Sequence, residues 1–343
     1  MAKQLIKGND AVVRGAILGG CTHFFGYPIT PATEITHGAA EFFPRAGGVF
    51  LQAEDEVNAI NMVYGAAAAG ARAMTASSGP GMSLMSEGIS FIAGAELPAV
   101  VVNVQRAGPG LGNIWPEQSD YNQSVKGGGH GNYRNLVLAP ASAQEMCDFT
   151  YQAFELAERY RMLVMILADA YVGQIMEPVE LPTVVKRAPA HPWAVRADRA
   201  TRSNLHTSIF MSIEVQSEVN RRLQEKYALV SANEVRYEET LCADAEVLFV
   251  AFGITARVCA TAVRSLRARG VRAGLFRPQT LYPFPSQRLA ELATSVKRII
   301  VAELNNGQMV DDVKLAAQGR CPVESFGWMG GYVPSAREIV SRI

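Results

Sequence analysis

The sequence has 343 residues, which is enough for two domains, and 49% of them are hydrophobic. Lysine plus arginine and aspartate plus glutamate number 32 each, so no long-range field toward nucleic acid or an anionic membrane is expected. The five cysteines form no CxxC pair or Cys/His cluster, and neither a signal-peptide segment nor an apolar run of roughly 20 residues occurs. We therefore expect a cytoplasmic protein with reduced, buried thiols and no metal or iron–sulfur site of its own.

Helical and extended patterns alternate along the first half of the chain, as in a doubly wound parallel sheet. The predicted strands are 49–53, 72–77, 99–104, 136–140 and 163–168. Helices are predicted near 10–20, from Glu56 onward, after Gly81, and from Ser142, whose spacing to Glu145 predicts a capping box, toward Tyr160. The strand 99–104 is apolar except for Asn103, which indicates burial on both of its faces.

The composition changes after residue 178, where prolines and basic residues indicate an extended linker that leads into a helix at about 208–227. The basic residues predict a solvated face, with a subunit contact as the alternative. A second series begins near residue 246, with strands at 247–252, 272–276 and 298–303 and helices at 255–269 and 285–294. We expect two doubly wound α/β domains at 1–180 and 241–343, joined by a linker with one helix at 181–240.

The segment from Leu51 to Gly70 is the most informative part of the sequence. A strand end runs through Glu54, Asp55 and Glu56 into a helix that ends in small residues, which allow another backbone to approach closely. This pattern suits a buried interface. A helix start favours a carboxylate by roughly 0.3 to 1 kcal/mol, so plain helix capping would also produce the acidic cluster.

Four motifs follow one another in the chain: Tyr27-Pro28-Ile29-Thr30-Pro31, Glu56 nine residues before Gly65, Ser78-Gly79-Pro80-Gly81, and Val101 to Arg106. Together they resemble the alpha subunit of 2-oxoacid:ferredoxin oxidoreductases, which belong to the thiamine diphosphate enzyme superfamily. The 2-oxoisovalerate, or branched-chain, type is the most similar. The resemblance covers nearly the whole chain and implies a pyrimidine-binding-type domain followed by a transketolase C-terminal-like domain.

The resemblance implies that Glu56 contacts the aminopyrimidine ring of thiamine diphosphate. A carboxylate there stabilises the imino form of the ring, in which the cofactor's own amino group removes the thiazolium C2 proton. A low dielectric would strengthen this charge-assisted hydrogen bond. Glu54, two residues away, is the alternative. Further cofactor contacts are implied for the motif residues Tyr27, Pro28, Ser78 and Gly79.

Two residues are implied to bind the substrate carboxylate. Pro28 and Pro31 restrict the backbone, so the Thr30 hydroxyl is held with little conformational freedom left to lose. Arg106 follows the carboxyl end of a buried strand, where open α/β sheets place ligand contacts, and a guanidinium there could clamp a carboxylate bidentately. A rigid turn at Thr30 and a solvated strand end at Arg106 are the alternatives.

The segment 107–132 is long and glycine-rich for a loop inside a compact domain, which is typical of a functional lid or a subunit contact. Gln118, Asp120 and His130 are candidate site residues within it. His130 could act as an acid/base or hydrogen-bonding group, although a lone histidine is more often structural. No G-x-G-x-x-G opens a βαβ unit, which disfavours a nicotinamide-binding site.

The sequence lacks the G-D-G motif through which thiamine enzymes anchor the diphosphate and Mg²⁺. The nearest candidate, Asp169, is flanked by alanines instead of glycines. The chain therefore resembles the pyrimidine-binding half of a split enzyme that shares thiamine diphosphate with a beta subunit. Mg²⁺ and the iron–sulfur clusters would then lie on partner subunits, which could include gamma and ferredoxin-like delta subunits.

The activity implied by the resemblance is oxidative decarboxylation of a 2-oxoacid with coenzyme A to acyl-CoA, CO2 and reduced ferredoxin. 2-Oxoisovalerate is the expected substrate and 2-oxoglutarate the alternative. A noncatalytic interaction subunit of a thiamine diphosphate complex is a hypothesis from another class. Catalysis requires Glu56, Thr30 and Arg106 to converge on one cavity, whereas an interaction subunit leaves them apart. The missing diphosphate motif weakens a third hypothesis, a thiamine-dependent ligase or decarboxylase without redox chemistry.

Overall fold

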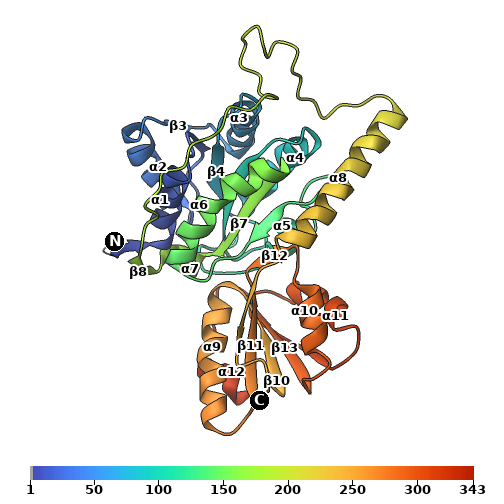
Figure 1. Ribbon diagram of the computed structural model, residues 1–343. Coiled ribbons are helices and arrows are strands. Elements are labelled where there is room, and N and C mark those ends of the chain that lie inside the picture. The colour runs from blue at the N-terminus through green and yellow to red at the C-terminus, as the bar shows by residue number, and fades with distance from the viewer. Residues whose placement is uncertain (1–2) are drawn as a thin grey trace.

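A computed structural model of the chain describes residues 3–343 and shows two α/β domains stacked one above the other (Figure 1). The sheet of the N-terminal domain has seven strands, in the order β12 (Thr280–Tyr282), β6 (Leu136–Leu138), β7 (Leu163–Asp169), β5 (Ala99–Gln105), β4 (Ala73–Ser77), β2 (His23–Gly26) and β3 (Val49–Gln52). All pairs are parallel except β12–β6. Every residue of the central strands β4, β5 and β7 is buried, which confirms the two-sided burial predicted for 99–104.

Helices cover both faces of this sheet. They are α1 (Gly8–Leu18), α2 (Thr33–Arg45), α3 (Glu56–Ala68), α4 (Gly79–Gly94), α5 (Tyr121–Val125), α6 (Ala143–Tyr160) and α7 (Ala170–Gln174). The largest helix pairs are α1 with α6 and α3 with α4. A two-stranded antiparallel ribbon, β1 (Gln4–Lys7) with β8 (Met176–Val179), closes the domain beside α1.

The C-terminal domain repeats the architecture on a smaller scale. Its sheet has the order β14 (Val323–Gly327), β13 (Arg298–Glu303), β10 (Val247–Val250), β11 (Ala273–Pro278) and β9 (Tyr237–Thr240), with only β9 antiparallel. The helices are α9 (Gly253–Ala268), α10 (Ser286–Leu292), α11 (Met309–Ala317) and α12 (Ala336–Ser341). The predicted class of two doubly wound α/β domains is confirmed.

The linker arches away from the N-terminal domain before it enters α8 (Ile213–Asn233), which begins and ends several residues later than predicted (Figure 1). Two short strands cross the predicted domain limits. β9 lies in the segment expected to be linker and joins the C-terminal sheet, whereas β12 leaves the C-terminal domain to pair with β6. Strands of three or four residues carry too little periodicity to be predicted, and their pairing partners are distant in sequence.

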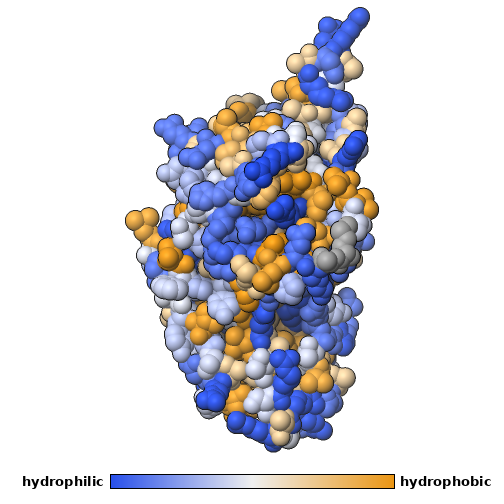
Figure 2. Space-filling model, turned by 90° about the vertical axis from the view of Figure 1, so that its left-hand side faces the viewer, coloured by the Kyte–Doolittle hydropathy of each residue, from blue (hydrophilic) through white to orange (hydrophobic). Residues whose placement is uncertain are grey.

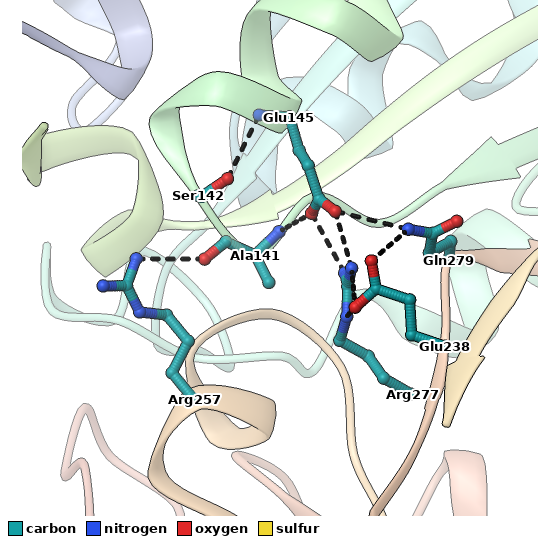
Figure 3. Close-up of polar contacts among 7 residues, drawn as sticks. All are labelled: Ala141, Ser142, Glu145, Glu238, Arg257, Arg277 and Gln279. Carbon is teal, nitrogen blue, oxygen red and sulfur yellow. Dashed lines mark hydrogen bonds and ion pairs between the residues drawn. The ribbon is translucent and has the colours of Figure 1, made fainter. Parts of the chain in front are cut away.

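Arg277 of β11 joins the two domains (Figure 3). Its guanidinium donates to both carboxylate oxygens of Glu145 in α6, at 2.6 and 3.0 Å, and also pairs with Glu238. The predicted capping box is therefore only half formed. Ser142 accepts the backbone N–H of Glu145, but the Glu145 carboxylate turns to Arg277 and to the Ala141 N–H instead of the Ser142 N–H.

No helix among residues 3–343 is both long and apolar enough to span a membrane. All five cysteines are free and buried, as expected.

Candidate active site

Glu56 is the first residue of α3, and it is buried, whereas Glu54 is exposed. Helix capping does not account for it, because the Asp55 carboxylate caps α3 by accepting the Asn58 N–H at 2.7 Å. The Glu56 carboxylate turns inward, and its Oε1 lies 3.4 Å from the Ser77 hydroxyl at the end of β4. Asp55 therefore serves as the cap of α3, and the Glu56 carboxylate makes its contact outside its own helix.

The turn Ser78-Gly79-Pro80-Gly81 leaves room for this carboxylate. A Cβ on Gly81 would lie 2.4 Å from Glu56 Oε1 and 2.1 Å from the Ser77 hydroxyl. Both distances are far inside van der Waals contact, which begins at about 3.5 Å. A glycine is required at position 81 because Glu56 and Ser77 converge on its Cα.

The outer face of α3 has no partner within the described chain. Val57, Asn61 and Gly65 are exposed on that face, while the opposite side of the helix is buried against the domain. A Cβ on Gly65 would meet nothing within 4 Å. Because Glu56 begins this helix, its carboxylate lies at the edge of a surface that another chain can approach closely.

Thr30 and Arg106 are in direct contact. Arg106 Nη1 donates to the backbone carbonyl of Thr30 at 2.8 Å, and Nη2 donates to that of Leu111 at 2.9 Å. These bonds use two of the five guanidinium N–H groups, and Nε is buried without a partner in the described chain. The Thr30 hydroxyl is exposed, with only Thr33 nearby at 3.5 Å. The arginine is therefore held in place while donors remain for a ligand.

Further polar groups lie at the carboxyl ends of β4 and β5. Asp120 accepts a hydrogen bond from Asn103 at 3.0 Å and another from the backbone N–H of Gly79, and it lies near Arg106. Burial raises the pKa of Asp120 above its usual value, and those hydrogen bonds only partly offset the effect. The Ser78 hydroxyl is also buried without a partner in the described chain. Unsatisfied buried polar groups of this kind mark a place where a ligand or water completes the hydrogen bonding.

Two clefts open beside the Thr30–Arg106 contact. The first, of about 630 Å³, has mainly apolar walls, with Ile114, Trp115, Pro116, Ile175 and Val333 among the lining residues. The second, of about 530 Å³, is lined by Arg106, Asp120 and Glu117 from the N-terminal domain and by the amides of Asn305, Asn306 and Gln308 from the other domain. Both clefts thus lie where the two domains meet.

The three principal candidates surround one turn but do not line one cleft, so the convergence on one cavity expected of a catalytic subunit is not seen within the described chain alone. A Cβ on Gly79 would lie 3.8 Å from Arg106 Cγ, while Gly81, two residues on, abuts Glu56. Thr30 borders the apolar cleft and Arg106 the polar one, and Glu56 lines neither. Tyr27 and Pro28 precede Thr30 in the same loop, and Tyr27 is exposed.

Two other candidates have different surroundings. Gln118 is buried between the domains, where its amide donates to Asp169 and to the Phe252 carbonyl. His130 is exposed, with its carbonyl bonded to Ser90 and its ring against Phe91. Phe91 lies twelve residues beyond Gly79 in α4, or about 18 Å along the helix axis. His130 is therefore not grouped with the other candidates.

The Asp169 carboxylate is fully engaged within the protein. It accepts the backbone N–H groups of Val172 and Ile254, in the first turns of α7 and α9, as well as an N–H of the Gln118 amide. Burial raises the pKa of this carboxyl group. Residues 3–343 contain no group of three or more His, Cys, Asp or Glu side chains that could hold a metal ion.

Glu117 was not among the predicted site residues. Its buried carboxylate accepts the backbone N–H of Gly108 at 3.0 Å and that of Gly330 at 2.6 Å. It thereby holds the loop after Arg106 against the C-terminal domain. No local signal distinguished it, since one of its partners is 213 residues away.

Comparisons with known proteins show the family to which the chain is related. Residues 14–240 match the family described as pyruvate flavodoxin/ferredoxin oxidoreductase, thiamine diphosphate-binding, and residues 245–339 match core domain II of pyruvate:ferredoxin oxidoreductase. The ketoisovalerate oxidoreductase subunit VorB of Methanothermobacter marburgensis is 58% identical over 100% of this chain and 97% of its own. The 2-oxoglutarate synthase subunit KorA of Archaeoglobus fulgidus is 39% identical over 97% of this chain and 96% of its own.

Two solved structures have similar folds. The 2-oxoglutarate:ferredoxin oxidoreductase from Magnetococcus marinus, with 2-oxoglutarate, coenzyme A and succinyl-CoA bound, has a TM-score of 0.89 and 29% identity. The match covers 99% of this chain and 64% of that one. A split-gene transketolase, with a TM-score of 0.62 and 16% identity, shares the fold over 98% of this chain and 96% of its own. The chain belongs to the 2-oxoacid:ferredoxin oxidoreductases, which are thiamine diphosphate-dependent enzymes, as a subunit of the ketoisovalerate type.

Proposed function

We propose that this chain supplies the pyrimidine-binding half of a thiamine diphosphate site and the carboxylate-binding residues for a branched-chain 2-oxoacid. In the complete enzyme the 2-oxoacid and coenzyme A would yield acyl-CoA and CO2, with the electrons passing to ferredoxin. The observation that carries the proposal is Glu56, a buried carboxylate that does not cap its helix and lies at the edge of the exposed face of α3.

The residues present suit this cofactor. Glu56 would accept a hydrogen bond from a pyrimidine nitrogen, and Gly81 keeps the space in front of its carboxylate free of side-chain atoms. The buried, unpartnered Ser78 hydroxyl provides a further polar contact. When bound, thiamine diphosphate would supply a nucleophilic carbon and an electron sink for decarboxylation of the 2-oxoacid. The protein's part is to bind, to orient and to hold the proton near Glu56 Oε1.

The diphosphate, Mg²⁺ and the iron–sulfur clusters belong on partner subunits in this proposal. A beta subunit would cover α3 and complete the cofactor site, with gamma and delta subunits as further partners. Two features of this chain support the division. The G-D-G motif is missing from the sequence, and the carboxylate of Asp169 is already engaged by two helix starts and Gln118.

Arg106 and Thr30 would bind the substrate carboxylate, because the guanidinium keeps free donors and the Thr30 hydroxyl is exposed beside it. The adjacent apolar cleft favours a branched aliphatic side chain. It disfavours the second carboxylate of 2-oxoglutarate, because its described lining residues include the Glu34 carboxylate and no lysine or arginine. Burial opposes ionisation of Glu34, but hydrogen bonds from Gln174 and Asn9 and the Lys7 ammonium 3.5 Å away outweigh it and lower its pKa.

The decisive experiment compares Glu56→Gln with Glu54→Gln in the assembled enzyme. Turnover of 2-oxoisovalerate with coenzyme A and a low-potential dye acceptor should fall on the order of 10²- to 10⁴-fold for Glu56→Gln, since an amide cannot replace the carboxylate. Glu54→Gln, at an exposed neighbouring carboxylate, is the matched control and should keep most activity. Near wild-type turnover by a folded, assembled Glu56→Gln enzyme would remove Glu56 from the mechanism.

A further inference from the structure

The linker ends in an extended segment whose two faces differ. Side chains at even positions face the domain: His206 Nε2 lies 2.9 Å from the Trp193 carbonyl oxygen, and Phe210 packs against the hydrophobic core. Leu205, Ile209 and Met211 are 79%, 73% and 92% exposed, while Thr207 between them is half-buried. The segment therefore has one side anchored to the domain and one side rich in exposed apolar side chains.

Two more exposed apolar side chains follow in the first turn of α8: Ile213 is 81% exposed, and Val215 is also exposed. We call residues 205–215 the linker arm. Burying a side chain of this size contributes about 1.5 to 3 kcal/mol, so five exposed in eleven residues are unusual for a surface that stays in water. Within the described chain, residues 205–211 also make no backbone–backbone hydrogen bond. The Ile209 N–H is bonded to the Thr207 hydroxyl at 3.1 Å, so the arm offers a partner its exposed apolar side chains and not a regular strand edge.

The tip of the linker, just before the arm, is positively charged. Arg196, Arg199 and Arg202 form none of the ion pairs found among residues 3–343, and Asp198, the only acidic residue at 186–213, is bonded to Thr201. Figure 2 shows the linker as a largely hydrophilic projection at the top of the molecule. Unpaired arginines beside an apolar row match a partner surface on which carboxylates flank an apolar groove.

The linker contacts the last residues of α3 and α4. The Val195 N–H donates to the Ala68 carbonyl at the end of α3, and Ser208 Cβ lies 3.0 Å from where a Cβ on Gly94 would be, at the end of α4. These two helices begin at Glu56 and Gly79, so one surface runs from the candidate active site along α3 and α4 to the arm.

We propose that the linker arm docks in an acid-flanked apolar groove of the partner subunit that covers α3, so that it clamps the subunit completing the cofactor site. This inference rests on the proposed function for the identity of that partner. Five side chains expose too little area for the roughly 800 Å² per partner that a stable interface needs. The arm therefore extends the interface at α3 instead of forming a separate dimer.

The test is a double variant, Met211→Glu with Ile213→Glu, measured for binding to the separately purified partner subunit by analytical ultracentrifugation. Both side chains are exposed in this chain, so its circular dichroism and thermal unfolding should not change. The dissociation constant should rise on the order of 10- to 100-fold. Leu315→Glu, at a 72% exposed leucine of α11, is the matched control and should bind like the wild type.

A second variant tests the charges. Arg199→Glu with Arg202→Glu should slow association and flatten its dependence on salt concentration. An unchanged dissociation constant for the apolar variant would overturn the proposal. So would a dimer of the isolated chain that the apolar variant converts to a monomer, since the arm would then bind a second copy. Failure of the proposed function is separate, because it would appear as an active Glu56→Gln enzyme whatever the arm binds.

Discussion

Gly81 and Glu56 are in contact: a Cβ on Gly81 would lie 2.4 Å from the Oε1 atom of Glu56. We expect Gly81→Ala to displace the Glu56 carboxylate or the turn before α4, because the Ser77 hydroxyl blocks the other direction at 2.1 Å. Overpacking of this kind costs about 1 to 3 kcal/mol of stability. Turnover should fall much further than stability, to a level approaching that of Glu56→Gln. Urea unfolding and steady-state kinetics on one preparation check both parts, and full activity would show that the carboxylate position is not critical.

Arg106 should affect substrate binding more than cofactor binding. Arg106→Lys keeps the charge but loses the planar fork, so KM for 2-oxoacids should rise with cofactor occupancy unchanged. Arg106→Ala should lower kcat/KM by a factor equivalent to about 2 to 5 kcal/mol of lost transition-state stabilisation, because it leaves the substrate carboxylate unpaired. Thr30→Val should weaken the same substrates in parallel.

The measurement is steady-state kinetics across several 2-oxoacids, with thiamine diphosphate content determined for each variant. If kcat/KM of Arg106→Ala is unchanged for all of them, the arginine serves only to hold the Thr30 and Leu111 carbonyls.

Asp120 should make the folded state less stable as pH rises. Burial raises its pKa in the folded state above the ordinary 3.8, so the folded chain holds this proton more tightly than the unfolded chain does. Stability then decreases as pH increases from about 4 through the raised pKa, and levels off above it. Asp120→Asn removes this dependence, so the free energy of unfolding of the variant relative to wild type should improve between pH 4 and pH 7.

Chemical denaturation at several pH values checks this, because other buried carboxyl groups are common to both proteins and cancel in the difference. Parallel curves for wild type and variant would mean that Asp120 titrates alike in the folded and unfolded chains.

Arg277 should stabilise the protein through its ion pairs with Glu145 and Glu238 at the contact between the two domains. Its side chain is 8% exposed, and Arg277→Ala would leave the carboxylates of Glu145 and Glu238 facing one another without a cation. We expect a loss of about 2 to 4 kcal/mol in the free energy of unfolding. The control is Arg272→Ala, at an arginine 56% exposed and paired with Glu246, which should cost less than about 1 kcal/mol. Equal losses of stability for the two substitutions in thermal or urea unfolding would show that the ion pairs of Arg277 between the domains contribute no more than a surface pair.

The sequence by itself determined the alternation of strands and helices, the two α/β domains and the acidic start of α3. These follow from local periodicity and from glycine and proline positions, which act within a few residues. Glu56, Thr30 and Arg106 were identified from the motifs that carry the family resemblance, and they lie at the start of α3, in the loop after β2 and directly after β5.

Only the tertiary structure decided which carboxylate of the acidic cluster turns inward, because that depends on Asp55 taking the cap and on Gly81 leaving space from another element. The tertiary structure likewise directs the Glu145 carboxylate to Arg277, 132 residues later in the chain, and the predicted capping box is left half formed. His130, plausible from composition, lies beside Phe91 on the far part of α4. In each case the deciding contact joins residues distant in sequence, and the local propensity of residues for helix or strand cannot predict such contacts.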